Sequence, residues 1–188
     1  CIVKQMLKAQ VVLPDGTRTT PTKGTPQGGI LSPLLSNIVL NELDWWVTSQ
    51  WEEMPTHYEY KTRQNAHGTD IKSHTYRALR RSRLKEMYIV RYADDFKIFC
   101  RSRQDAEKAF EATRLWLKDR LGLEISPEKS KVINLKQRYS EFLGFKMKVY
   151  PKGKKYVVCS HMSDKAIKQA KGKISAAIRA IQNPADDR

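Results

Sequence analysis

Cysteine and long apolar runs are scarce in this sequence, and each shortage excludes a class of protein. The three cysteines, Cys1, Cys100 and Cys159, are odd in number, widely separated and outside any Cys-x-x-Cys pair, so neither a disulfide framework nor a zinc site is predicted. This usage fits a reducing compartment. No run of about 18 apolar residues could span a bilayer, and the mean hydropathy is −0.62. We therefore expect a cytoplasmic protein without a membrane partner.

Acidic residues are also few. The 188 residues carry 35 Lys and Arg against 20 Asp and Glu, which gives a formal net charge of +15 and a pI near 9.8. So much positive self-repulsion favours a polyanionic partner, and nucleic acid is the first to consider. With 40% hydrophobic and 9% aromatic residues, the chain is too apolar for a disordered basic tail. The length predicts one domain, or one domain and the start of another.

The first third of the chain predicts a hairpin, a loop and a helix. The chain opens on Cys1 without an initiator Met or a leader, which predicts a fragment of a longer protein. Residues 14–16, Pro-Asp-Gly, predict a hairpin tip in which Asp15 is only a turn residue. After a loop at 20–29, Ser32 as N-cap begins a helix that runs to about residue 51. The apolar spacing predicts its buried face: Leu35, Ile38, Val39, Leu43, Trp46, Val47.

Residues 54–83 are polar and show no helical or strand period, which predicts an insertion or flexible loop. Between residues 61 and 103, twelve Lys and Arg face four Asp and Glu, a local net charge of +8. That charge suits nucleic acid, and it equally suits a solvated charged loop. The histidines of this region lack the i, i+4 spacing of a zinc motif, so we expect them on the surface: His57, His67, His74.

The middle of the chain predicts two strands and a helix. The apolar segments 87–92 and 96–100 are joined by Ala93-Asp94-Asp95, a link so short that only a tight hairpin fits. Ser102 with Asp105 then forms a capping box, and an apolar stripe predicts a helix that stops at Gly122.

The last third predicts short strands and a final helix. We expect strands at 123–126, at 132–135 and from residue 139, and a turn at 150–153 that leads to a strand at 156–159. Ser163 caps the last helix, whose apolar face is expected to point inward: Ile167, Ala170, Ile174, Ile178, Ile181. This helix should begin a second domain.

Two adjacent carboxylates at a hairpin tip, Asp94 and Asp95, indicate the chemistry of the protein. Strands on both sides hold them at a fixed point, where their mutual repulsion calls for a cation. Hard oxygen ligands suit Mg²⁺, which is usually bound by one or two carboxylates together with substrate phosphates. An ordinary charged turn remains the alternative on the hairpin alone. A two-metal centre needs a further carboxylate from another strand, and none upstream of Asp94 is convincing.

A second signal is the loop Gln27-Gly28-Gly29 before the helix at Ser32. Glycines without Cβ allow a substrate to approach the backbone, and a helix N-terminus favours phosphate. Taken alone, the pattern also fits an ordinary loop into a capped helix.

In this order, four motifs resemble the later motifs of reverse transcriptases. They are TPQGGILSPLLSNI at 25–38, Tyr-Ala-Asp-Asp at 92–95, the stretch from 121 to 131, and Phe-Leu-Gly-Phe at 142–145. The doubled glycine and the alanine before Asp94 look most like bacterial group II intron-encoded proteins, which combine reverse transcription with intron splicing (maturase) activity. The resemblance covers roughly residues 20–159.

The resemblance implies an α+β fold. It would be a right-hand polymerase palm, an antiparallel sheet with helices packed on one face, followed by the first thumb helix. Residues 1–160 would be a fingers and palm fragment lacking its N-terminal part, with the basic insertion at 54–83. Residues 161–188 would begin the helical thumb (maturase) domain.

The same resemblance implies a role for each matching residue. Asp94 would bind both Mg²⁺ ions with Asp95 in support, and Lys129 would neutralise or protonate the pyrophosphate leaving group, with Lys131 a close alternative. The remaining matches are contacts to nucleotide and template (Gln27, Gly28, Gly29, Tyr92), a primer grip (Phe142, Leu143, Gly144, Phe145) and lysines for a duplex backbone (Lys165, Lys168, Lys171).

One departure matters. The family's first catalytic aspartate precedes the Gln-Gly-Gly motif, and nothing between residues 1 and 26 matches it. It would lie on an N-terminal segment that could be a separate chain, and the residues here would be half of the active site. The implied partners are an intron RNA template, a DNA or RNA primer, deoxynucleoside triphosphates and that segment, and a homodimer stays open.

Three other interpretations compete. A retron or diversity-generating reverse transcriptase would share the Asp94-Asp95 pair but lack a splicing role. An RNA-binding splicing cofactor would carry a vestigial polymerase site. A basic protein of the membrane surface fits poorly, because the last helix has small apolar residues and no aromatic anchor.

Overall fold

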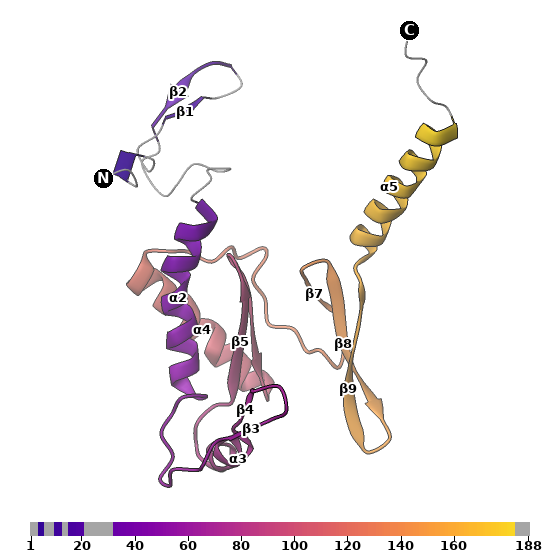
Figure 1. The fold of residues 1–188 in the computed structure, drawn as a ribbon. Coiled ribbons are helices and arrows are strands. Elements are labelled where there is room, and N and C mark those ends of the chain that lie inside the picture. The colour runs from indigo at the N-terminus through magenta and orange to yellow at the C-terminus, as the bar shows by residue number, and fades with distance from the viewer. Residues whose placement is uncertain (1–3, 6–9, 13–14, 21–31, 183–188) are drawn as a thin grey trace. The chain divides into compact units, whose positions relative to one another are not determined.

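The computed structural model describes residues 4–5, 10–12, 15–20 and 32–182, and the chain divides into two compact units, 1–125 and 126–188 (Figure 1). Each described strand pair is antiparallel, and helices alternate with small sheets, so the expected α+β class is confirmed. The division into compact units does not test the domain boundary expected near residue 160, which stays a prediction. None of the described helices is both long and apolar enough to cross a membrane.

Among its described residues, the first unit contains three short hairpins and the helices α2, α3 and α4. In the first hairpin, Asp15 Oδ1 accepts a hydrogen bond from the Thr17 N–H at 2.9 Å, so Asp15 is the turn residue that its Pro-Asp-Gly setting predicts. The elements are β1 (Val11–Val12), β2 (Arg18–Thr19), α2 (Ser32–Gln50), β3 (Arg63–Gln64), β4 (Asp70–Ile71), α3 (Ser73–Arg81), β5 (Met87–Tyr92), β6 (Asp95–Cys100) and α4 (Arg103–Leu121).

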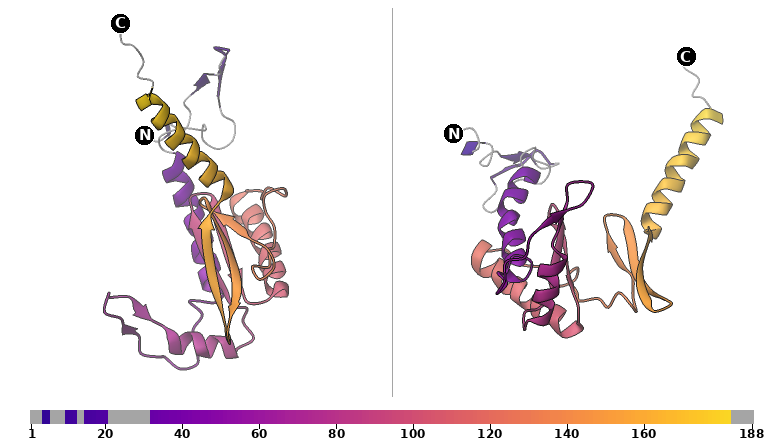
Figure 2. Two further views of the ribbon diagram at one scale, coloured as in Figure 1. Left: turned by 90° about the vertical axis from the view of Figure 1, so that its right-hand side faces the viewer. Right: turned by 60° about the horizontal axis from the view of Figure 1, so that its bottom comes forward.

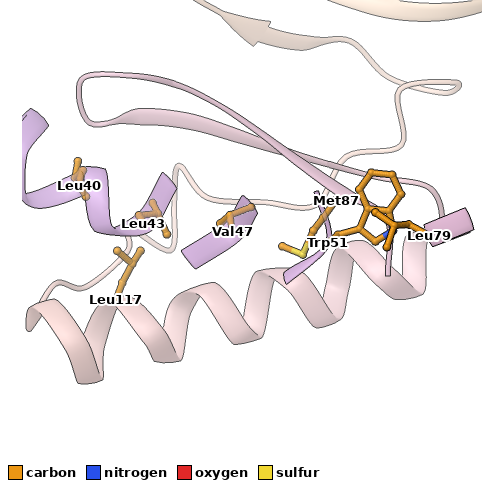
Figure 3. Packing of buried hydrophobic residues seen from close by; sticks show 7 residues of the cluster. All are labelled: Leu40, Leu43, Val47, Trp51, Leu79, Met87 and Leu117. Carbon is orange, nitrogen blue, oxygen red and sulfur yellow. The ribbon is translucent and has the colours of Figure 1, made fainter. Parts of the chain in front are cut away.

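The core of the first unit lies where α2, α3, α4 and β5 meet (Figure 3). Trp51, just beyond α2, is fully buried and stacks on Tyr76 of α3 with 5.3 Å between the ring centroids. The expected buried face of α2 is partly wrong, because Ile38 and Val39 are 60% and 45% exposed. The apolar stripe that packs into the core lies further along the helix and just past its end, from Leu40 to Trp51, with spacings of three and four residues. The buried apolar cluster is Leu40, Leu43, Val47, Trp51, Leu79, Met87, Leu117.

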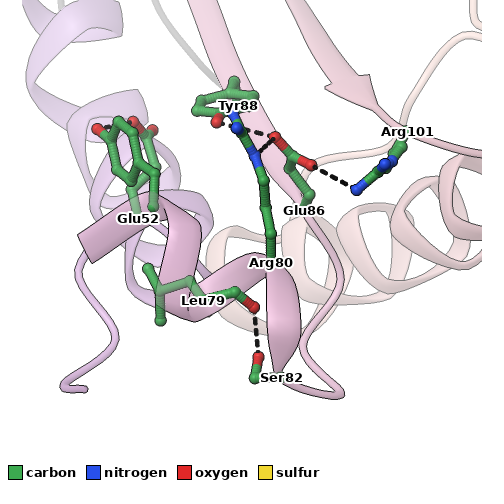
Figure 4. A network of polar contacts seen from close by, with 8 residues as sticks. Glu52, Leu79, Arg80, Ser82, Glu86, Tyr88 and Arg101 are labelled. Atoms are coloured by element: carbon green, nitrogen blue, oxygen red, sulfur yellow. Dashed lines mark hydrogen bonds and ion pairs between the residues drawn. The ribbon is translucent and has the colours of Figure 1, made fainter. Parts of the chain in front are cut away.

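Helix α3 corrects the expectation of a loop without secondary structure at 54–83. It spans nine residues, which is shorter than the window over which a helical period is read from sequence, and its one buried residue is Leu79. Ion pairing ties it to β5: Arg80 Nε lies 3.0 Å from Glu86 Oε1, and the Tyr88 hydroxyl donates to the same oxygen at 3.1 Å (Figure 4). Part of this basic segment is therefore built onto the core, while β3 and β4 form a small exposed hairpin.

Helix α4 has the caps that the sequence predicts. Ser102 Oγ accepts a hydrogen bond from the Asp105 N–H at 3.1 Å, and Gly122 ends the helix in the left-handed region with φ of 63°. Only glycine adopts that conformation without steric cost, which explains why the helix stops there. α4 packs on β6 and α2 on β5.

The second unit is one three-stranded sheet and a helix. Its elements are β7 (Ser140–Phe142), β8 (Phe145–Lys152), β9 (Lys155–Met162) and α5 (Asp164–Gln182), with strand order β7-β8-β9 (Figure 2). Ser163 Oγ caps α5 as predicted, accepting from the Ala166 N–H at 3.2 Å. Two expectations are wrong. Residues 123–126 and 132–135 form no strand, and α5 buries none of its residues, with Ile181 80% exposed.

Candidate functional site

A two-residue turn, Ala93-Asp94, joins β5 to β6 and carries the Asp94 carboxylate, and Asp95 follows as the first residue of β6. Tyr92 pairs with Asp95 at the end of the ladder, so the predicted tight hairpin is confirmed. Asp94 and Asp95 are both exposed. Ala93 has a φ of 52°, a left-handed conformation that costs an L-residue roughly 1–2 kcal/mol. The carboxylates therefore lie at a strained and solvent-accessible tip.

The hairpin has a covered face and an open face, because side chains alternate along each strand. The covered face, defined by Met87, Ile89, Phe96 and Ile98, packs against the core cluster. The open face carries Tyr92 opposite Asp95, and Tyr92 is 64% exposed. Tyr92 and Asp95 are therefore accessible together to a large ligand.

The donor set suits a hard cation but is incomplete. Two carboxylates supply the oxygen ligands that Mg²⁺ prefers. Within the described ranges, no three His, Cys, Asp or Glu side chains come together in a way that could hold a metal ion. Asp94 and Asp95 thus fit Mg²⁺ as part of a site that needs further ligands from substrate or from another carboxylate.

Arg91, which none of the sequence motifs singles out as a site residue, places its guanidinium beneath the turn. Its Nε and Nη2 donate to the Asp44 carboxylate at 2.7 to 3.0 Å, and its Nη1 donates to Asn37 Oδ1 and to the Ala93 carbonyl, each at 2.8 Å. Hydrogen bonding to Asp44 raises the pKa of Arg91 above its ordinary value, so the group stays charged. One signal was available: Arg91 occupies a position of β5 that alternation assigns to the core, where a charge needs a partner.

The expected primer-grip residues form a second tight turn. Phe142 pairs with Phe145, and Leu143 and Gly144 between them have φ of 51° and 79°. The Ser163 N–H donates to the Gly144 carbonyl at 2.7 Å, which ties the turn to the start of α5. These four residues therefore make a hairpin turn at one end of the sheet.

The other expected site residues either are exposed lysines or lie outside the described residues. Lys129 lies exposed in a turn closed by a hydrogen bond from the Ser130 N–H to the Ser126 carbonyl, and Lys131 is exposed beside it. Gln27, Gly28 and Gly29 lie outside the described residues. The expected duplex-binding lysines are all exposed on α5: Lys165, Lys168, Lys171.

One face of the second unit's sheet combines lysines with tyrosines, another feature that the sequence analysis missed. The Tyr139 and Tyr150 hydroxyls lie 2.5 Å apart, and this hydrogen bond raises the pKa of Tyr150. Lys148 Nζ lies 5.4 Å from the Tyr150 ring centroid and 5.4 Å from that of Tyr139, and Lys146 lies 5.6 Å from Tyr139. Flat rings with cations above them are typical of surfaces that contact nucleic acid. We call these four residues the Lys–Tyr face.

Comparison with known proteins identifies the family. The family model described as "Reverse transcriptase (RNA-dependent DNA polymerase)" matches residues 2–147. The group II intron-encoded protein LtrA of Lactococcus lactis is 34% identical over 163 residues, covering 69% of this chain and 26% of that protein. Two putative COX1/OXI3 intron proteins of Saccharomyces cerevisiae, from introns 2 and 1, are 30% and 27% identical and cover 80% and 97% of this chain.

The chain spans about a fifth to a quarter of the length of these relatives. The family model, in contrast, matches well over half of the chain and includes both hairpins that carry the resemblance. The chain therefore belongs to the reverse transcriptase (RNA-dependent DNA polymerase) family.

Proposed function

We propose that the chain is part of an RNA-directed DNA polymerase encoded by a group II intron. The observation that carries the proposal is the Ala93-Asp94 turn: two accessible carboxylates on a strained hairpin tip, within a chain that matches the reverse transcriptase family. The relatives with the same family resemblance are named as intron-encoded or intron proteins. The reaction is the addition of deoxynucleotides to a primer 3′ hydroxyl on an RNA template.

Asp94 and Asp95 hold two Mg²⁺ ions in this proposal. When bound there, the ions would supply activation of the attacking hydroxyl and stabilisation of charge on the leaving oxygen. A further carboxylate comes from a part of the reverse transcriptase domain outside this chain, carried by the same polypeptide or by a separate one. Tyr92, next to Asp95 on the open face, lies against the primer end.

The remaining expected residues complete the polymerase. Gln27, Gly28 and Gly29 contact the template base and the incoming nucleotide. Lys129, or Lys131 beside it, neutralises the pyrophosphate. Residues 142–145 form the primer grip. The hairpin of β5 and β6 with α2 and α4 belongs to the palm, and α5 begins the thumb with its lysines toward a duplex backbone.

Intron RNA binding, with a role in splicing and intron mobility, is the second part of the proposal. The Lys–Tyr face and the α5 lysines support it, because the face supplies aromatic rings with Lys148 beside them and α5 supplies exposed lysines, while Lys146 is paired with Asp164 at 2.7 Å. Such binding is largely electrostatic. We expect affinity to fall on the order of a thousandfold between about 50 and 200 mM salt for about 6 to 10 phosphate contacts.

The test is primer extension on an RNA template by the full-length protein with Mg²⁺. Asp94→Ala removes transition-state charge stabilisation worth several kcal/mol, so we expect the rate to fall roughly three orders of magnitude. Asp119→Ala, which changes an exposed aspartate of α4, is the matched control and should extend normally.

RNA affinity, measured in parallel, separates the interpretations. We expect Asp94→Ala to bind intron RNA as the wild type does, because removing one anion from a positive surface does not weaken its attraction for a polyanion. Undiminished extension by Asp94→Ala would make the turn an ordinary one and favour a splicing cofactor with a vestigial site. Extension without any effect on splicing would favour a retron or diversity-generating enzyme.

A further inference from the structure

We infer that Arg91 is the positioning residue of the metal-binding turn, fixing the Ala93 carbonyl and thereby the direction of the Asp94 carboxylate. The inference rests on the proposed function in one respect, the assignment of Asp94 as a metal ligand. It concerns how that ligand is held, which neither the family resemblance nor the relatives' names address.

The turn needs an external support. Ala93 is held at a φ of 52°, which an L-residue leaves unless the surrounding structure fixes it. A change in the backbone angles of Ala93 and Asp94 would turn the Asp94 Cα–Cβ bond, and with it the carboxylate, away from its present direction. A metal ligand must stay within about half an ångström of its productive position. Something must therefore hold this peptide.

Arg91 supplies that support from the covered face. Its Nη1 donates to the Ala93 carbonyl at 2.8 Å, inside the turn itself. The same nitrogen donates to Asn37 Oδ1 at 2.8 Å, and the rest of the guanidinium grips the Asp44 carboxylate. The side chain is only 11% exposed. Arg91 thus fixes the position of the turn relative to α2. In the sequence, α2 begins shortly after the expected nucleotide-binding loop at 27–29.

A plain structural ion pair is the competing explanation, and the geometry separates the two. An ion pair between β5 and α2 needs only Arg91 and Asp44. The bond from Nη1 to the Ala93 carbonyl is not needed for that pairing and reaches the turn itself, while the bond to Asn37 attaches the same nitrogen to α2. A lysine could pair with Asp44, but its single ammonium cannot reproduce the planar fork that reaches all three partners.

The experiment uses the full-length protein with Arg91→Lys. We expect a folded protein whose extension rate falls about 10- to 100-fold, whose half-maximal Mg²⁺ concentration rises in similar proportion, and whose KM for primer-template stays unchanged. Equilibrium Mn²⁺ binding, followed by electron paramagnetic resonance, should weaken in parallel and gives a readout independent of turnover.

Arg120→Ala is the matched control. Arg120 of α4 also bridges to α2, through Glu42 at 2.9 Å, but it contacts no residue of the turn. We expect its Mg²⁺ dependence to equal that of the wild type. Asn37→Ala, which removes one partner of Nη1, should shift the Mg²⁺ dependence in the same direction as Arg91→Lys and by less. If Arg91→Lys does not fold, the Mg²⁺ dependence of Asn37→Ala tests the inference instead.

Two outcomes overturn the inference. The first is Arg91→Lys with lowered thermal stability but wild-type Mn²⁺ affinity and rate per folded molecule, which would make Arg91 a structural ion pair only. The second is an unfolded Arg91→Lys together with an Asn37→Ala that is indistinguishable from the wild type. Asp94→Ala, assayed alongside, keeps this test separate from the proposed function: undiminished extension there refutes the metal site, whatever Arg91 does.

Discussion

Two of the four motifs that resemble reverse transcriptases lie at tight turns. The two turns have a similar backbone conformation but are held by different contacts. Ala93-Asp94 and Leu143-Gly144 each place a non-glycine residue near a φ of 50°. The first is held by the Arg91 side chain and stands on a core of buried apolar residues. The second is held by a backbone hydrogen bond from Ser163 to Gly144.

The difference is clearest in burial. Every buried apolar side chain among the described residues belongs to the first unit, and the buried residues of the second unit are Ser140 and Ser163. The first turn is therefore sensitive to side-chain substitutions far along the sequence. The second is specified by local backbone geometry, which substitutions of distant side chains leave intact.

The largest expected effect on stability comes from the core below the first turn. Trp51→Ala should lower the free energy of unfolding by about 3–5 kcal/mol, because a fully buried indole leaves a cavity. Trp51→Phe should cost less, since most of the ring volume remains and a buried N–H without a hydrogen-bond partner among the described residues is removed. Urea denaturation followed by circular dichroism measures both.

Val158→Ala in β9 is the control for that pair. Its side chain is 67% exposed, so we expect a change within about 0.5 kcal/mol. A cost for Val158→Ala comparable to that for Trp51→Ala would mean that the second unit has a core of its own, and the contrast between the two turns would disappear.

The reactivity of Cys100, at the base of the β5–β6 hairpin, depends on pH in a way that tests how well the hairpin is packed. Burial, helped by the nearby Asp105 carboxylate, raises the pKa of this thiol to about 11 from an ordinary value of 9.0. At pH 8 the thiolate fraction is then roughly a hundredfold lower, and because a more basic thiolate is more nucleophilic, alkylation should slow about tenfold. The rate should climb as the pH rises towards 11.

Iodoacetamide labelling with mass spectrometry, in a variant with Cys1→Ser and Cys159→Ser, measures this protection. The denatured chain gives the unprotected rate. Labelling of the folded protein at the denatured rate would show that the base of the hairpin is open and that the first turn lacks the packed support described above.

The smallest effect concerns the two helix caps. Ser102 and Ser163 each accept a hydrogen bond from the backbone N–H three residues later. Replacing either by alanine should cost about 1 kcal/mol of unfolding free energy. Ser163→Ala keeps the backbone N–H that binds Gly144, so its cost should match that of Ser102→Ala in urea denaturation. A much larger cost would assign the buried Ser163 hydroxyl a second structural role.

Local signals in the sequence predicted much of the fold. The hairpin at Asp94 and the Ser102 and Gly122 caps depend on neighbouring residues, and all are confirmed. The expected hairpin of β8 and β9 is present, but its turn lies at 153–154 rather than at 150–153, because residues 150–152 still pair with β9. Helix α3 escaped detection because its nine residues, most of them polar, are fewer than the window over which a helical period is read. The strands expected at 123–126 and 132–135 are absent, although the Leu135 carbonyl accepts one hydrogen bond from the Val149 N–H of β8 at 2.9 Å.

The candidate site was predicted only in part, for a similar reason. The carboxylates stand together in the sequence, so spacing alone brought Asp94 and Asp95 to the tip. Arg91 finds Asp44 across 47 residues and Asn37 across 54, and no spacing rule links them. The functions assigned to Lys129 and to residues 142–145 depend on partners outside the chain and stay predictions.

Ser163 connects three parts of the second unit. It follows β9 directly, caps α5 through its side chain and donates its backbone N–H to the Gly144 carbonyl, so the helix and the turn share one joint. The 19 residues of α5 extend roughly 28 Å from this joint at 1.5 Å per residue. We expect a displacement of the lysine-bearing helix to be passed to the Leu143–Gly144 turn through the backbone of Ser163.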